Sequence, residues 1–131
     1  MTFKLSKRSM GRLEGVHPDL VEVITESIKR VPIDFGISEG MRSIERQKEL
    51  LDSGASTTMN SRHLTGHAID FFAVVGGEVR WDWPLYHQIA DVIIEVAKEL
   101  GVPIDAGAKW KRFPDGPHVQ LAWKEYPKGG A

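Results

Sequence analysis

The twelve residues from Ser61 to Phe72 (SRHLTGHAIDFF) restrict the fold of this chain more than any other stretch. They place two imidazoles and a carboxylate close together, and they continue as an apolar run to Val75. An apolar run of this length predicts a buried strand, and a carboxylate in a buried strand is costly unless it is paired or binds a cation. The stretch therefore predicts a strand that begins at a cation-binding turn.

A second cluster of the same form lies near the end of the chain, where Asp115-Gly116-Pro117-His118 runs into another apolar stretch. Taken together, His63, Asp70 and His118 supply two nitrogen ligands and one oxygen ligand, and Asp115 is left over. Three protein ligands with an open fourth position are typical of a catalytic zinc site. A plain turn residue is the alternative for Asp115, because it stands between a proline and a glycine.

The other histidines are weaker candidates as metal ligands. His67 competes with His63, because two histidines four residues apart on a helix face the same metal ion. Gly66 and the threonine before it disfavour a helix at this point, so we expect His63 to be the ligand. We expect His17 and His87 to be surface or core residues without a ligand role.

Composition excludes several classes of function. The chain has 131 residues with 41% apolar and 27% charged residues, which suits one globular domain spanning 1–131. Its net charge of −1 argues against nucleic acid as the main partner. The absence of cysteine excludes disulfides, thiolate nucleophiles and cysteine-bound zinc. We find no secretory signal and no run long enough to span a bilayer, and nothing demands more than a monomer.

Hydrophobic periodicity and turn residues predict mixed secondary structure. Helices are expected over 18–30, between Ser43 and Gly54, and over 84–101, and the basic arm 1–16 is expected to hold one short turn of helix. Strands are expected over 34–38, 68–75, 78–81 and 117–123, with a shorter one within 103–113. Gly76-Gly77 predicts a hairpin and hence antiparallel pairing, so we expect an α+β fold with a small, mainly antiparallel sheet flanked by helices.

The two clusters carry a family resemblance. The pattern Ser61-x-His63-x-x-Gly66-x-Ala68-x-Asp70, followed by Asp115-x-x-His118, resembles the two motifs of zinc peptidases that cleave peptidoglycan stem peptides. These are the D-Ala-D-Ala carboxypeptidases and dipeptidases, and the L-alanyl-D-glutamate endopeptidases used as endolysins by tailed phages. Gly40-Met41-Arg42-Ser43 and Gly107-Ala108-Lys109-Trp110 resemble two further elements of the family. The short form with Ile69-Asp70-Phe71 looks most like the phage endopeptidases.

The resemblance implies a fold of the hedgehog and D-Ala-D-Ala peptidase type, with zinc at the sheet, and it implies roles for individual residues. Zinc is held by His63, Asp70 and His118, and Asp115 serves as general base and then general acid. Arg42 stabilises the oxyanion in the family; from sequence alone it is a charge at a helix start. Ser61 contacts the substrate or orients its loop, and Trp110 walls the cleft or belongs to the core.

The substrate implied is a peptidoglycan stem peptide with free carboxylates. The basic residues that suit these carboxylates, with a solvated basic face as the equal alternative, are Arg62, Lys109, Lys111 and Arg112. One departure concerns substrate contacts: many relatives carry a Trp-Gly-Gly-Asp-Trp-like stretch where this chain has Asp105-Ala106-Gly107-Ala108-Lys109-Trp110.

The expected function is therefore a zinc-dependent L-alanyl-D-glutamate endopeptidase of a phage or prophage, without a separate wall-binding domain. It is expected to wait in the host cytoplasm until the membrane is breached and then to act on the cell wall, without stable membrane association. One alternative is a D,D-carboxypeptidase or dipeptidase with the same chemistry. Another is a binding module that keeps the zinc fold but has lost activity, against which the presence of Asp115 and Arg42 argues.

Overall fold

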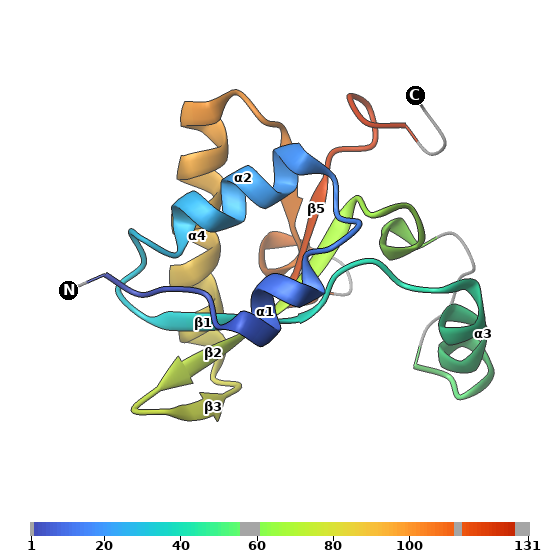
Figure 1. The fold of residues 1–131 in the computed structure, drawn as a ribbon, viewed down its shortest axis with the longest axis horizontal. Coiled ribbons are helices and arrows are strands. Elements are labelled where there is room, and N and C mark those ends of the chain that lie inside the picture. Colours follow the sequence, from blue (N-terminus) through green and yellow to red (C-terminus); the bar gives the residue numbers. More distant parts are fainter. Residues whose placement is uncertain (1, 56–60, 112–113, 128–131) are drawn as a thin grey trace.

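The structure, a computed structural model, describes residues 2–55, 61–111 and 114–127. It confirms an α+β fold with an antiparallel sheet flanked by helices (Figure 1). The α-helices are α1 (Lys7–Arg12), α2 (Pro18–Ser27), α3 (Ile44–Asp52) and α4 (Trp83–Leu100), with short 3-10 helices η1 (Arg62–Thr65) and η2 (Gly107–Lys109). The strands are β1 (Asp34–Glu39), β2 (Ala68–Val75), β3 (Glu78–Arg80), β4 (Ile104–Ala106) and β5 (His118–Leu121).

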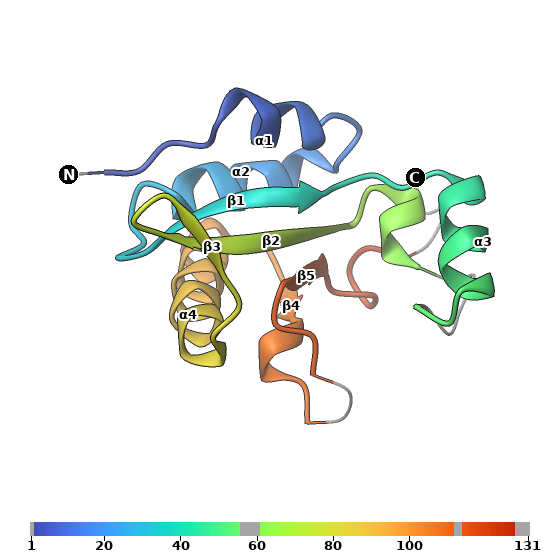
Figure 2. The ribbon, with the colours of Figure 1, turned by 90° about the horizontal axis from the view of Figure 1, so that it is seen from below.

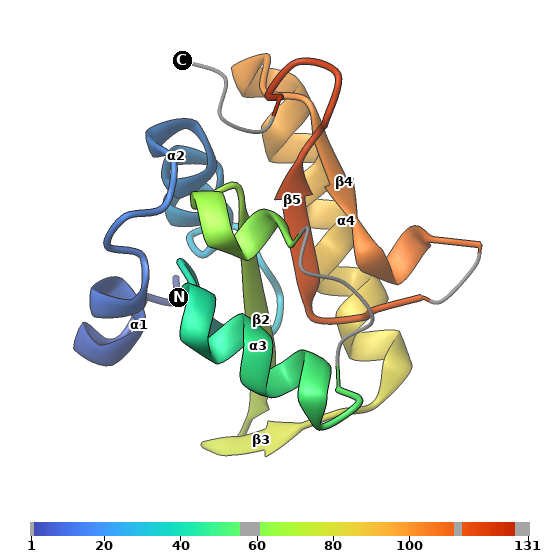
Figure 3. The same ribbon diagram turned by 90° about the vertical axis from the view of Figure 1, so that its right-hand side faces the viewer.

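Strand β2 is the centre of the sheet. The strand order is β1-β2-β5-β4, and β3 pairs with the far end of β2 as the predicted hairpin. All of the strand pairs are antiparallel. In the β2–β5 pair, Asp70 lies directly opposite His118 (strands in Figure 3). The pairing therefore brings two residues that are 48 positions apart in the sequence to one point of the sheet.

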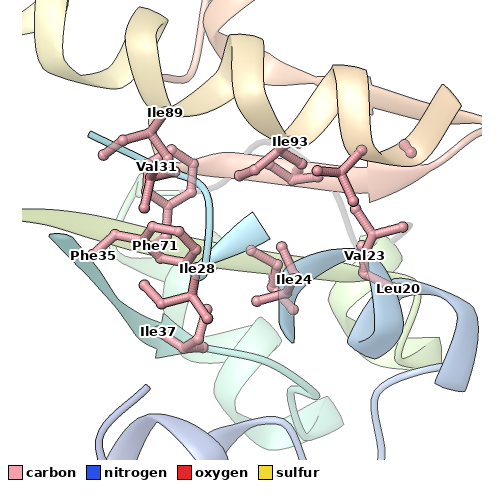
Figure 4. Packing of buried hydrophobic residues seen from close by; sticks show 14 of the residues in the cluster. Leu20, Val23, Ile24, Ile28, Val31, Phe35, Ile37, Phe71, Ile89 and Ile93 are labelled. Atoms are coloured by element: carbon pink, nitrogen blue, oxygen red, sulfur yellow. The ribbon is translucent and has the colours of Figure 1, made fainter. Parts of the chain in front are cut away.

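The core lies between the sheet and the two longest helices. Along β2 the side chains of Ile69, Phe71 and Ala73 are fully buried, whereas Asp70 and Phe72 on the other face are only partly buried. Apolar side chains of α2 and α4 pack against this buried face (Figure 4). Burial of apolar area at roughly 25 cal/mol per Å² makes this cluster the main source of stability, and it fixes which face of β2 points away toward the site.

Helix α1 covers the free edge of β1. The Ser9 Oγ accepts a hydrogen bond from the Ile37 N–H at 2.9 Å, and the Arg12 Nη1 donates to the Ile37 carbonyl oxygen at 2.9 Å. In Figure 2, α1 lies beside β1, whereas α2 and α4 lie together behind the sheet. Side chains of α1 thus replace the strand that would otherwise pair with this edge. The sequence predicted only one turn of helix in this arm.

Most element boundaries agree with the sequence within a few residues. Ser43 is the N-cap of α3, as expected, and its Oγ accepts a hydrogen bond from the Arg46 N–H. The helix predicted over 18–30 ends at Ser27, and the strand predicted over 117–123 is limited to β5. Much of the polar loop expected over 54–62, Arg112 and the tail beyond Pro127 lie outside the described residues. Among the described residues, no helix combines the length and apolar character needed to cross a bilayer.

Candidate active site

Three side chains from separate elements converge at the start of β2. His63 Nε2 lies 3.3 Å from Asp70 Oδ1, and His118 Nδ1 lies 3.2 Å from the same oxygen. Both imidazoles are buried, and Asp70 keeps partial contact with solvent. One ligand atom from each residue falls within 4.8 Å of the others, which is the arrangement that can hold a metal ion. The structure therefore brings together the three ligands predicted from the sequence.

A short 3-10 helix positions His63. The sequence disfavoured any helix between His63 and His67, but η1 spans Arg62–Thr65. Ser61 is its N-cap and accepts a hydrogen bond from the His63 N–H at 3.2 Å, so Ser61 orients the loop. Gly66 ends η1 with φ +74°, and a Cβ at this position would lie 2.3 Å from the Gly15 carbonyl oxygen. The helix therefore stops before His67, and His63 rather than His67 lies in the group that could hold a metal ion.

His67 faces a different part of the molecule. Its Nδ1 contacts the Thr65 hydroxyl at 2.5 Å, and its ring lies near the rings of His17 and Tyr126. Burial, together with the positive charge of Arg62, lowers the pKa of His67. His17 is the N-cap of α2 and accepts a hydrogen bond from the Asp19 N–H at 3.1 Å. Neither residue belongs to the metal-binding group, as expected from the sequence.

The outer nitrogen of each ligand imidazole has its own partner. His63 Nδ1 lies 2.8 Å from the Gly40 carbonyl oxygen, and His118 Nε2 lies 2.7 Å from Gln120 Oε1. Because both partners accept, these outer nitrogens carry the hydrogens and the inner nitrogens keep their lone pairs. Gln120 was not predicted from the sequence. Its position did offer a signal, because Gln120 and His118 are two residues apart in a strand and such residues share a face.

The charges at the site favour an ionised Asp70. Burial alone raises the pKa of Asp70, but the hydrogen bonds and charges of His118 and His63 outweigh burial and hold it well below its usual range. Burial alone lowers the pKa of His118, but the hydrogen bond and charge of Asp70 outweigh it and raise this pKa. The carboxylate is thus available as an anionic ligand at neutral pH.

Asp115 lies on the turn before β5 and is not one of the ligands. Its carbonyl oxygen accepts a hydrogen bond from the His118 N–H at 3.1 Å, and its N–H donates to the Gly107 carbonyl oxygen at 3.0 Å. The turn packs so closely that a Cβ on Gly107 would lie 2.3 Å from the Asp115 carbonyl oxygen. Asp115 is an exposed residue, but its carboxyl group is partly shielded from solvent. This shielding, and to a smaller extent the negative charge of Asp70, raises the pKa of Asp115. A raised pKa suits a group that exchanges protons.

Arg42 reaches the same site from the chain that precedes α3. Its side chain donates to Glu39 through Nε and Nη2, and through Nη1 to Gln47 Oε1 at 2.7 Å. Nη2 lies 4.0 Å from Asp70 Oδ2, and the Arg42 N–H donates to the His63 carbonyl oxygen at 2.8 Å. Glu39 and Gln47, which the sequence analysis did not single out, therefore hold the guanidinium beside the ligand carboxylate.

Trp110 and the predicted basic residues occupy different surroundings. The Trp110 ring is half-buried with its centroid 5.3 Å from that of His118, so it borders the site. Lys109 pairs with Asp91 of α4 at 2.8 Å. Arg62 was predicted either to suit substrate carboxylates or to lie on a solvated basic face, but it is only 3% exposed. It donates to the Leu121 carbonyl oxygen and lies over the Trp123 ring, so both predictions were wrong. Lys111 is exposed.

Comparison with solved structures gives a match over nearly the whole molecule. The crystal structure of Serratia marcescens L-Ala D-Glu endopeptidase ChiX is similar with a TM-score of 0.91 and 44% sequence identity. The match covers 96% of this chain and 95% of that chain. The similarity therefore includes the sheet and the loops that carry the site.

Comparisons of sequence give the same grouping. The L-alanyl-D-glutamate peptidase of Escherichia phage T5 is 31% identical over 92% of this chain and 99% of its own length. The peptidoglycan L-alanyl-D-glutamate endopeptidase CwlK of Bacillus subtilis (strain 168) is 35% identical over 68% of this chain and 61% of its own length. A sequence model of phage L-alanyl-D-glutamate peptidases matches residues 1–122. The chain therefore belongs to the phage L-alanyl-D-glutamate peptidase family.

Proposed function

We propose that this protein is a zinc-dependent endopeptidase that hydrolyses the L-alanyl-D-glutamate bond of peptidoglycan stem peptides. The observation that carries the proposal is the convergence of His63, Asp70 and His118 within 4.8 Å, beside Asp115 and Arg42. The names of the phage and Bacillus relatives support the choice of bond. As an endolysin, the protein would act on the wall once the host membrane is breached.

The donor set fits zinc. Two imidazole nitrogens and one carboxylate oxygen are ligands that zinc accepts, and three protein ligands leave a fourth position open. The outer nitrogens of both imidazoles donate to Gly40 and Gln120, so the inner nitrogens face Asp70 and would hold the ion together with it. Zinc, when bound, supplies a Lewis acid and lowers the pKa of a water molecule from ~16 toward ~7.

The protein's own groups account for the proton transfers and for part of the charge stabilisation. Asp115 takes the proton of the attacking water and delivers it to the leaving amine of D-glutamate, a role that its raised pKa supports. The guanidinium of Arg42 stabilises the negative charge that develops on the L-alanine carbonyl oxygen. Glu39 and Gln47 keep this guanidinium in place during the reaction.

The test combines metal analysis with product analysis. We expect purified protein to hold about one zinc per chain by the ligand count, and digested peptidoglycan to show new N-terminal D-glutamate by mass spectrometry. Asp115→Ala should keep the metal but lower hydrolysis by ~10² to 10⁴-fold, the usual contribution of a general base. His118→Ala should lose the metal. Release of terminal D-alanine would instead identify a D,D-carboxypeptidase, and full activity of Asp115→Ala would remove Asp115 from the mechanism.

A further inference from the structure

Two tryptophans stand exposed where the chain passes from β3 into α4. The side chains of Trp81 and Trp83 are 63% and 48% exposed, which is a high exposure for residues of this size. Large apolar groups that remain in water at one place usually mark an interaction surface. No role in the fold or in the proposed chemistry has been assigned to either ring.

The chain holds these rings in fixed positions. Trp81 stacks on buried Tyr86 with an interplanar angle of 4° and a centroid distance of 5.8 Å. The Tyr86 hydroxyl donates to the Arg80 carbonyl oxygen at 2.7 Å and accepts from the Ala73 N–H at 3.1 Å. The residue before Trp81 is thus tied to the sheet. One face of this ring lies against the protein, and the other is open to a ligand.

The tryptophan surface is continuous with the candidate active site. A Cβ on Gly116 would lie 3.4 Å from the Trp83 ring and 3.5 Å from Tyr86. Gly116 follows Asp115 directly and lies two residues before the ligand His118. The Trp110 ring also lies next to the His118 ring. Figure 3 shows the first turn of α4 beside the chain that leads into β5.

The chemistry of the proposed substrate indicates what covers this surface. In peptidoglycan, the amine of L-alanine is joined through a lactyl group to a muramic acid ring of the glycan strand. The L-alanyl-D-glutamate bond therefore lies about two residue lengths, or ~7 Å, from a sugar. An enzyme that cuts this bond has to accommodate the glycan beside its metal site. Hexosamine rings present C–H faces, and indole rings are well suited to pack against such faces.

We propose that Trp81 and Trp83 form a binding surface for the glycan strand of peptidoglycan. This inference rests on the proposed function, because it places the sugar next to the bond that is cut. The surface lets the catalytic domain hold the polymer by its glycan while the stem peptide enters the site beside Trp110. Binding to the sugar then contributes to the affinity for peptidoglycan.

The first experiment compares two soluble substrates with the same stem. One is the disaccharide GlcNAc–MurNAc carrying L-Ala–D-Glu–diaminopimelate, and the other is the same tripeptide with an N-acetyl group in place of the sugars. We expect Trp81→Ala/Trp83→Ala to lower kcat/KM on the disaccharide substrate by about 10-fold, mainly through KM. Hydrolysis of the N-acetyl tripeptide should be unchanged. Leu100→Ala, at the exposed far end of α4, is the matched control.

The outcomes separate the possible roles of the two rings. An equal loss on both substrates would assign the tryptophans to the fold or to the peptide, and no loss on the disaccharide substrate would also overturn the proposal. Trp81→Phe/Trp83→Phe should recover most of the lost kcat/KM, because phenylalanine still presents an aromatic face.

A second experiment does not depend on hydrolysis. Glycan strands stripped of stem peptides are sedimented with the Asp115→Ala protein and with Asp115→Ala carrying both tryptophan-to-alanine changes. We expect the second protein to be retained several-fold less, and equal retention would overturn the glycan surface. If wild-type protein cleaves neither soluble substrate, the proposed function fails, and this sedimentation still decides the binding inference.

Discussion

The two histidines of the site face Asp70 with different ring nitrogens. His63 presents Nε2 and His118 presents Nδ1, because the Gly40 carbonyl and the Gln120 side chain bind the opposite nitrogens. These partners set the rotation of each ring before any ion is bound. Residues that are not themselves ligands thus determine which nitrogen of each ring faces Asp70.

We predict that Gln120→Ala weakens zinc binding by about 10- to 100-fold, because the His118 ring loses the acceptor that fixes its orientation. A titration against a competing chelator measures this affinity. Exposed Gln88 of α4 provides the control, and Gln88→Ala should bind zinc as the wild type does. An unchanged affinity in Gln120→Ala would show that the strand backbone alone orients His118.

At the residue scale, the sequence predicted that His63, Asp70 and His118 come together, because their types and order are distinctive. It did not predict the fate of Arg62, whose Nε and Nη1 are buried without a hydrogen-bond partner among the described residues. A basic residue in a polar loop is usually solvated. Only the three-dimensional fold places the Trp123 ring over this guanidinium, 4.1 Å from its central carbon.

At the scale of elements, α1 acts as a substitute strand. Ser9 and Ile37 are both buried, and the hydrogen bond between them joins residues 28 positions apart. Helices α2 and α4 were predictable because their apolar residues repeat at helical spacing, and β2 was predictable from its nearly continuous apolar run. A short turn of helix was expected within 1–16, but the attachment of α1 to β1 was not, because it depends on single side-chain contacts to a distant strand rather than on a repeat.

We predict that Ser9→Ala lowers the free energy of unfolding by about 2 kcal/mol, because the Ile37 N–H is left buried and unpaired. Urea unfolding followed by circular dichroism gives the change. Ser53→Ala, at the exposed end of α3, should change stability by no more than about 0.5 kcal/mol. Similar values for the two variants would mean that water reaches the Ile37 N–H when the hydroxyl is removed.

At the scale of the whole molecule, a half-buried carboxyl group lies at the far end of the sheet from the site. Asp34 opens β1 beside a groove lined by Phe3, Ile33, Val74 and Val75, and its Oδ1 is buried without a hydrogen-bond partner in the described part of the chain. Burial raises the pKa of Asp34. The folded state therefore holds the proton of this carboxyl more tightly than the unfolded chain does.

It follows that Asp34 costs stability once it is ionised. Below about pH 4, the ordinary pKa of aspartate, the carboxyl is neutral in both the folded and the unfolded state. The loss of stability appears as the pH rises from there through the raised pKa of the folded state. We predict that Asp34→Asn raises the free energy of unfolding by about 1 kcal/mol at pH 7 and that this gain disappears near pH 4. Urea unfolding at both pH values tests it, with exposed Glu78→Gln as control. A gain that persists at pH 4 would exclude charge as the cause.

The β2–β5 pairing also has a consequence for synthesis of the protein. His118 meets Asp70 only when β5 has been added to the sheet. The chain before β5 contains His63 and Asp70 but lacks the third member of the candidate metal-binding group. A nascent chain on the ribosome therefore carries an incomplete site until β5 has been translated. Partial translation products and fragments that end before β5 should be catalytically silent, whatever their concentration.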